Sequence, residues 1–80
     1  FNPSTTIKYA LPSAERVNIT IYNALGQKVK TLVNKHQDAG YYTVVWDGSN
    51  DVGEKVGSGI YFYVVKAGKH RAIKKMLLVK

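Results

Sequence analysis

The sequence contains no cysteine, so no disulfide bond can stabilise this chain of 80 residues. It has no apolar run close to the roughly 18 residues that a membrane-spanning helix needs, and we therefore expect no transmembrane segment. The chain must instead bury an apolar core, for which its hydrophobic share of 45% is sufficient. At this length we expect a single domain, residues 1–80.

Acidic residues are scarce, with five Asp and Glu against twelve Lys and Arg, which gives a net charge of +7. The last fifteen residues contain no acid but have six cations, which are Lys66, Lys69, Arg71, Lys74, Lys75 and Lys80. Such a segment either attracts an anionic partner or protects an edge strand from pairing, and we favour protection. We do not expect a nucleic-acid partner, because the tyrosines fall in segments needed for the core and the lysines cluster in another strand.

Short segments of alternating apolar and polar residues occur along the whole chain, and none has a helical hydrophobic period. They predict strands at residues 5–11, 16–23, 27–33, 41–47, 60–66 and 71–79, with loops at 34–40 and 48–59. Val29 and Leu32 are three positions apart, so we expect a β-bulge between them. Six or seven short strands without a helix predict an all-β fold, a small Ig-like antiparallel β-sandwich.

One face of each central strand is predicted to form the core. The residues concerned are Val17, Ile19, Ile21, Val44, Trp46, Tyr61 and Tyr63.

The segment 60–66 differs from the others because it is apolar on both faces. Its second face carries Ile60, Phe62 and Val64, although an outer face of a two-sheet sandwich is ordinarily polar. We expect Val45 and either Leu77 or Val79 to extend this face. The pattern predicts an outer apolar patch that contacts a host-protein domain, a second copy of the chain or a receptor.

Residues suited to catalysis are isolated from one another. His36 and His70 lie in predicted loops, with no second histidine nearby, and no serine has a G-x-S-x-G sequence around it. We therefore predict no catalytic residue, no cofactor and no enzymatic activity.

A calcium site is the weaker of two interpretations of the loop that begins at Asp47. Asp47, Asn50 and Asp51 could supply oxygen ligands, but Gly53 falls one position too late for an EF-hand loop and no helices flank it. Turn formation by these short polar side chains is the interpretation that we favour.

Five segments match a known family in order along the chain. They are FNPSTTI at residues 1–7, V-x-I-x-I-Y-N-x-L-G-Q-x-V at 17–29, A-G-x-x-x-V-x-W-D-G at 39–48, SGIYFY at 58–63 and KKMLLVK at 74–80. On these motifs the chain resembles the Ig-like C-terminal sorting domains of type IX secretion and the related Ig-like domain of the flagellar hook-capping protein.

The resemblance implies a non-catalytic C-terminal module, here a fragment of a longer exported bacterial protein that passes through the periplasm and is secreted or held at the cell surface. Its partner would be the type IX export machinery, with recognition at Leu25, Gly26, the Trp46–Gly48 corner and the closing strand with Lys74, Lys75 and Lys80. The alternative is a structural module that self-associates through an edge strand or the apolar patch. An accessory domain that binds carbohydrate or nucleic acid is a third, less favoured hypothesis.

Overall fold

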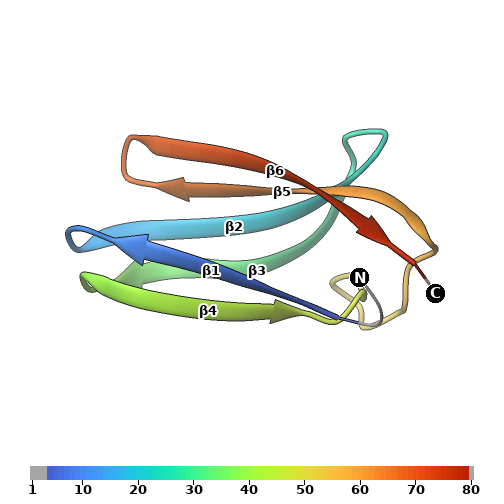
Figure 1. Ribbon diagram of the computed structural model, residues 1–80, viewed down its shortest axis with the longest axis horizontal. Coiled ribbons are helices and arrows are strands. Elements are labelled where there is room, and N and C mark those ends of the chain that lie inside the picture. The colour runs from blue at the N-terminus through green and yellow to red at the C-terminus, as the bar shows by residue number, and fades with distance from the viewer. Residues whose placement is uncertain (1–3, 80) are drawn as a thin grey trace.

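The computed structural model describes residues 4–79, which form six strands in two antiparallel sheets (Figure 1). The strands are β1 (Thr5–Leu11), β2 (Glu15–Asn23), β3 (Lys28–Gln37), β4 (Gly40–Trp46), β5 (Gly59–Ala67) and β6 (His70–Leu78). β1 and β4 form a two-stranded sheet, and the order in the other sheet is β3-β2-β5-β6. The predicted all-β fold, a small Ig-like sandwich, is confirmed. Residues 4–79 contain no helix long and apolar enough to cross a membrane.

Most strand boundaries agree with the sequence prediction, but β3 is longer than expected. Residues 34–37 were expected in a loop, whereas they continue β3 and pair with Glu15–Asn18 of β2. β3 lies at the edge of its sheet, where polar side chains can face solvent while the backbone still pairs. His36 therefore lies in a strand opposite Arg16 and not in a loop.

The expected irregularity in β3 is present as two register shifts. The pairing of β2 with β3 skips Leu32 and then Val29, so each is an extra residue on the bulged strand. Both side chains pack against the core. Strict alternation thus fails between Val29 and Leu32 because the two bulges return both side chains to the inner face.

The core lies between the two sheets. Its buried residues are Ile7, Leu11, Val17, Ile19, Ile21, Val33, Trp46, Tyr61 and Leu78. Among the residues predicted for the core, Val44 and Tyr63 are only partly buried and pack against this cluster. The core also contains residues that were not predicted for it from the sequence, namely Ile7, Leu11, Val33 and Leu78.

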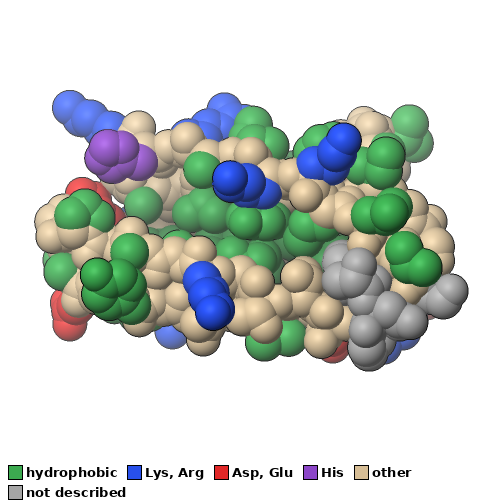
Figure 2. All heavy atoms as spheres, in the orientation of Figure 1, with side chains coloured by type: hydrophobic (Ala, Val, Ile, Leu, Met, Phe, Trp, Pro, Cys, Tyr) green, Lys and Arg blue, Asp and Glu red, His purple; other side chains and the backbone are tan. Residues whose placement is uncertain are grey.

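The two sheets differ in width, so part of the larger sheet has no facing strand among residues 4–79. On the inner face, Val17, Ile19 and Ile21 of β2 are fully buried. Tyr63 and Val65 of β5 are half-buried, and Ala72 and Lys74 of β6 are exposed. Figure 2 shows hydrophobic side chains in the opening between the two layers. The sandwich is therefore open along the side where β6 faces β1.

Candidate interaction surfaces

The connection between β4 and β5, residues 47–58, packs over one end of the core. Trp46 is fully buried, and its Nε1 donates a hydrogen bond to the carbonyl oxygen of Ser49 at 2.8 Å. Its ring meets the Tyr61 ring edge-on, with centroids 5.2 Å apart. The Tyr61 hydroxyl donates to the carbonyl oxygen of Gly57 at 2.7 Å, so both ends of the connection are attached to core aromatics.

Asp47 stabilises the first turn of this connection. Its Oδ1 accepts hydrogen bonds from the Ser49 hydroxyl and from the Ser49 backbone N–H, the latter at 3.0 Å. The Ser49 hydroxyl is the main cause that lowers the pKa of Asp47; burial opposes this effect, and the Ser49 N–H, Lys55 and Lys30 reinforce it. The Lys55 ammonium lies 3.7 Å from Oδ2 and donates to the Asp47 carbonyl oxygen at 2.9 Å.

Two turns, Asn23–Gln27 and Asn50–Glu54, have the same hydrogen-bond pattern. In each, the asparagine Oδ1 accepts from the backbone N–H groups two and four residues later, at 2.9–3.1 Å. The glycine at the fourth position donates its N–H to the asparagine carbonyl oxygen and has a positive φ, 81° in the first turn and 86° in the second. An Asn-x-x-Gly spacing thus builds the same turn twice in this chain.

Each of these turns exposes one apolar side chain at its third position. Leu25 is 84% exposed and Val52 is 78% exposed. Both turns lie at the same end of the sandwich (Figure 1). Leu25 and Gly26, predicted as recognition positions, are therefore at an accessible turn, and Val52 is a similar position that the sequence analysis missed.

The oxygen atoms proposed for calcium serve the backbone and nearby lysines. Asp51 Oδ1 accepts the Thr31 backbone N–H at 3.1 Å, and Oδ2 lies 3.7 Å from the Lys28 ammonium. Asp47 is paired with Lys55, and the Asn50 amide oxygen accepts two backbone N–H groups. In the described part of the chain, no three His, Cys, Asp or Glu residues are grouped as metal ligands. The geometry supports turn formation, the interpretation that we favoured.

The outer face of β5 and β6 carries the apolar patch expected from the sequence, with changed membership. Cross-strand pairing places Ile60 beside Leu77 and Val64 beside Ile73. Ile73 and Leu77 are 55% and 57% exposed, whereas Val64 is only 7% exposed beside Thr20 of β2. Val64 is therefore not available for docking, and Ile73 takes its place. We call Ile60, Phe62, Ile73 and Leu77 the outer patch.

Other residues assigned to this face lie elsewhere. Val45 is on β4 in the two-stranded sheet, so it does not extend the outer patch. Lys75 pairs with Phe62 on the outer face, whereas Lys74 pairs with Tyr63 on the inner face. Lys80 lies outside the described residues. The expected basic cluster is thus divided between two faces of β6.

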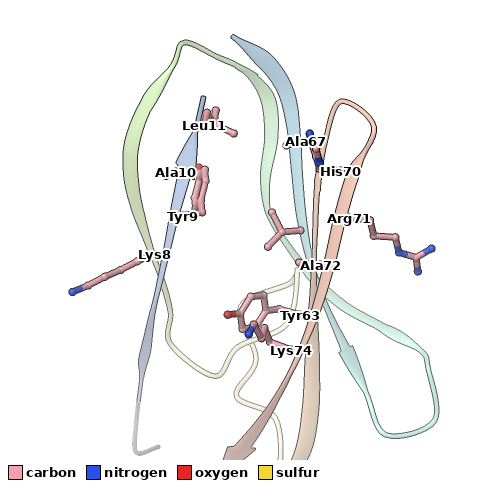
Figure 3. A pocket seen from close by; sticks show the side chains of 11 residues that line it. Lys8, Tyr9, Ala10, Leu11, Tyr63, Ala67, His70, Arg71, Ala72 and Lys74 are labelled. Atoms are coloured by element: carbon pink, nitrogen blue, oxygen red, sulfur yellow. The ribbon is translucent and has the colours of Figure 1, made fainter. Parts of the chain in front are cut away.

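A groove of about 300 Å³ lies on the inner face between β1 and β6. Figure 3 shows Tyr63 and Lys74 between the two strands, with Tyr9 and Leu11 on the β1 side. Ala72, opposite Val65, provides a small side chain on the floor. No local sequence pattern indicates this groove, because it depends on which strands lie opposite each other.

Comparison with known proteins resolves the family. Residues 3–70 match a family model described as FlgD Ig-like domain. The chain belongs to the FlgD Ig-like domain family. The predicted relation to the Ig-like domain of the flagellar hook-capping protein is thereby confirmed.

A solved structure of FlgD from P. aeruginosa has the same fold. Its TM-score with this chain is 0.71 at 20% sequence identity, over 92% of this chain and 57% of that chain. This chain therefore corresponds to little more than half of that FlgD chain, and at this identity the similarity concerns the fold alone. A search of the curated proteins gives no match.

Proposed function

We propose that this domain is a non-catalytic structural module that self-associates in an assembly at the cell surface or outside the cell. The observation that carries the proposal is the outer patch, which lies where a two-sheet sandwich ordinarily presents polar residues to water. Membership of the FlgD Ig-like domain family supports an assembly role.

The outer patch has the composition of a protein contact surface. Its apolar side chains surround Lys75, which pairs with Phe62, and the cations Lys66 and Arg71 pair at one end of the same outer face. Burial of the apolar side chains supplies the favourable free energy, about 25 cal/mol per Å² of apolar surface removed from water. The cations add little affinity, but they select the orientation of the partner.

Self-association can be tested with two double variants of the domain. Ile60→Ser with Ile73→Ser removes two of the four apolar side chains of the outer patch, whereas Tyr41→Ser with Val52→Ser changes two exposed side chains elsewhere. In sedimentation velocity over a concentration series, we expect the first pair to raise the dissociation constant at least about tenfold and the second to leave it unchanged. A monomeric wild-type domain, or equal effects of the two pairs, would contradict the proposal.

Export sorting is a second proposed function, favoured by the exposure of Leu25 and of most of β6, positions that the sequence resemblance implicated. In this role the partner would be the type IX export machinery, and the protein would be secreted or held at the surface. Residues 1–80 fused to a reporter should then direct it out of a type IX-competent cell, and Leu25→Asp should reduce export. Retention of the wild-type fusion inside the cell would exclude this role without affecting the self-association test.

A further inference from the structure

The groove between β1 and β6 occupies the position of an additional strand. An Ig sandwich of the constant type has seven strands, in sheets of four and three. Here a sheet of four faces a sheet of two, and β1 pairs only with β4 among the strands of residues 4–79. A third strand added at the other edge of β1 would cover the inner faces of β5 and β6, which is where the groove lies.

The burial of inner side chains shows how incompletely this side is covered. Val17, Ile19 and Ile21 of β2 are fully buried, whereas Val65 of the adjacent strand is only half-buried and Ala72 of the next is exposed. Burial therefore falls step by step toward the open edge. A strand that entered here would bury apolar surface that the chain leaves exposed to water.

The dimensions of the groove suit an extended peptide. β1 has seven residues, and a strand advances about 3.3 Å per residue, so a segment of about seven residues could pair along its length. The floor has the small side chains Ala67 and Ala72, which leave room for apolar side chains from an incoming strand. Addition of a strand to an exposed sheet edge is a known mode of peptide recognition.

The charges around the groove select among such peptides. Its lining contains Lys8, Arg71 and Lys74 and no carboxylate within the described chain. Figure 3 shows Lys8 and Arg71 directed away from the groove on opposite sides, with Lys74 between the strands. Lys74 is therefore the cation that an incoming strand would meet, and an acidic side chain would be favoured at the groove-facing position nearest to it.

We propose that this groove binds an extended segment of another polypeptide, about seven residues long, whose groove-facing side chains are apolar except for one acidic residue near Lys74. The segment pairs with the open edge of β1 as a third strand of the small sheet, and its apolar side chains cover Tyr63, Val65 and Ala72. This interaction goes beyond the proposed self-association, because it uses the opposite face of the sheet and a different partner.

Lys74 also gives the groove selectivity. A cation that points inward from an edge strand discourages pairing with strands that cannot neutralise it. Lys74 lies opposite Tyr63 on the inner face, so an apolar strand would have to remove its ammonium from water without a partner. A strand with a nearby glutamate or aspartate supplies that partner.

The test uses a fluorescein-labelled, capped peptide of about seven residues in which every second residue faces the groove. The groove-facing residues are valine except for one glutamate, and the residues between them are threonine. Titrated with the wild-type domain, it should bind saturably and slow amide hydrogen exchange in β1. A peptide with lysine in place of glutamate should bind at least about tenfold more weakly. Lys74→Glu should reverse this preference, and Ala72→Phe should abolish binding by filling the floor of the groove.

The matched control is Ile73→Ser, which changes the neighbouring residue on the outer face. It should leave peptide affinity unchanged even if it weakens self-association, so the two proposals can fail separately. Equal affinity for the acidic and basic peptides, or binding without protection of β1, would overturn the proposal. So would a domain that dimerises through the groove and loses the dimer in Ala72→Phe, because the occupant would then be a second copy.

Discussion

The inner face of the four-stranded sheet is covered in one half and open in the other, although the same kind of strand builds both. Over β2, the facing two-stranded sheet leaves Val17, Ile19 and Ile21 fully buried. Toward β6, Val65 is half-buried and Ala72 is exposed. The difference shows that burial of the inner side chains of the larger sheet depends on the width of the smaller sheet that faces it, and not on the sequence of the larger sheet alone.

The connection 47–58 closes part of the open half. At that end of β5 and β6, Tyr61 and Leu78 are buried, and Tyr61 is held between Trp46 and the carbonyl oxygen of Gly57. The connection therefore covers the inner face of the larger sheet at one end, as an additional strand would cover it along the whole length. The part of β5–β6 that this connection does not cover is the groove.

The largest effect should come from Trp46, which closes the covered end. Trp46→Ala removes a fully buried ring and its hydrogen bond to Ser49, and should lower the free energy of unfolding by about 3–5 kcal/mol. Urea denaturation followed by circular dichroism measures this loss. Tyr41→Ala, at a side chain that is 94% exposed, should change stability by no more than about 0.5 kcal/mol. Similar losses in both variants would contradict the assignment of Trp46 to the core.

An identical substitution in the two halves tests the comparison directly. Val17→Ala should lower the free energy of unfolding by about 2 kcal/mol, because both methyl groups are fully buried. Val65→Ala should lower it by less than about 1 kcal/mol, because its side chain is only half-buried beside the groove. Equal losses in urea denaturation would show that the groove is closed in solution.

Strand positions were predictable from this sequence where period-two alternation is unbroken. β1, β2 and β4 follow the expected faces because apolar residues at every second position place one side of each strand on the core. The end of β3 was missed because polar residues at a sheet edge resemble a loop in a single sequence. The two bulges were visible only as one failure of alternation between Val29 and Leu32.

The interaction surfaces were less predictable, because they depend on which strands are neighbours. Val64 belongs to an apolar face in the sequence, but Thr20 and Ile73 beside it determine that it is buried. The groove follows from the division into sheets of two and four strands, which no local pattern specifies. Some missed information was present: the Asn-x-x-Gly spacing at residues 23–26 recurs at 50–53 and identifies the second turn.

The smallest predicted effect concerns the acid that begins the closing connection. The pKa of Asp47 lies below its ordinary value of 3.8 in the folded protein, chiefly because the Ser49 hydroxyl donates to its carboxylate. The unfolded chain therefore binds more protons near this pH, so the stabilisation by Asp47 is present above pH 3.8 and is lost as the pH falls through the lower, folded pKa. The effect is modest because Asp47 is exposed and water screens its charge.

Asp47→Asn keeps an oxygen acceptor for Ser49 but removes this titration. In thermal unfolding between neutral and acidic pH, the wild-type domain should be more stable than Asp47→Asn above pH 3.8. This gap in stability should narrow below that pH. Asp38→Asn removes the same charge in the β3–β4 turn and controls for net charge. A gap that stays constant with pH, or that widens in acid, would mean that the carboxylate does not hold the turn through its charge, and that closure of this end depends on Trp46 and Tyr61 alone.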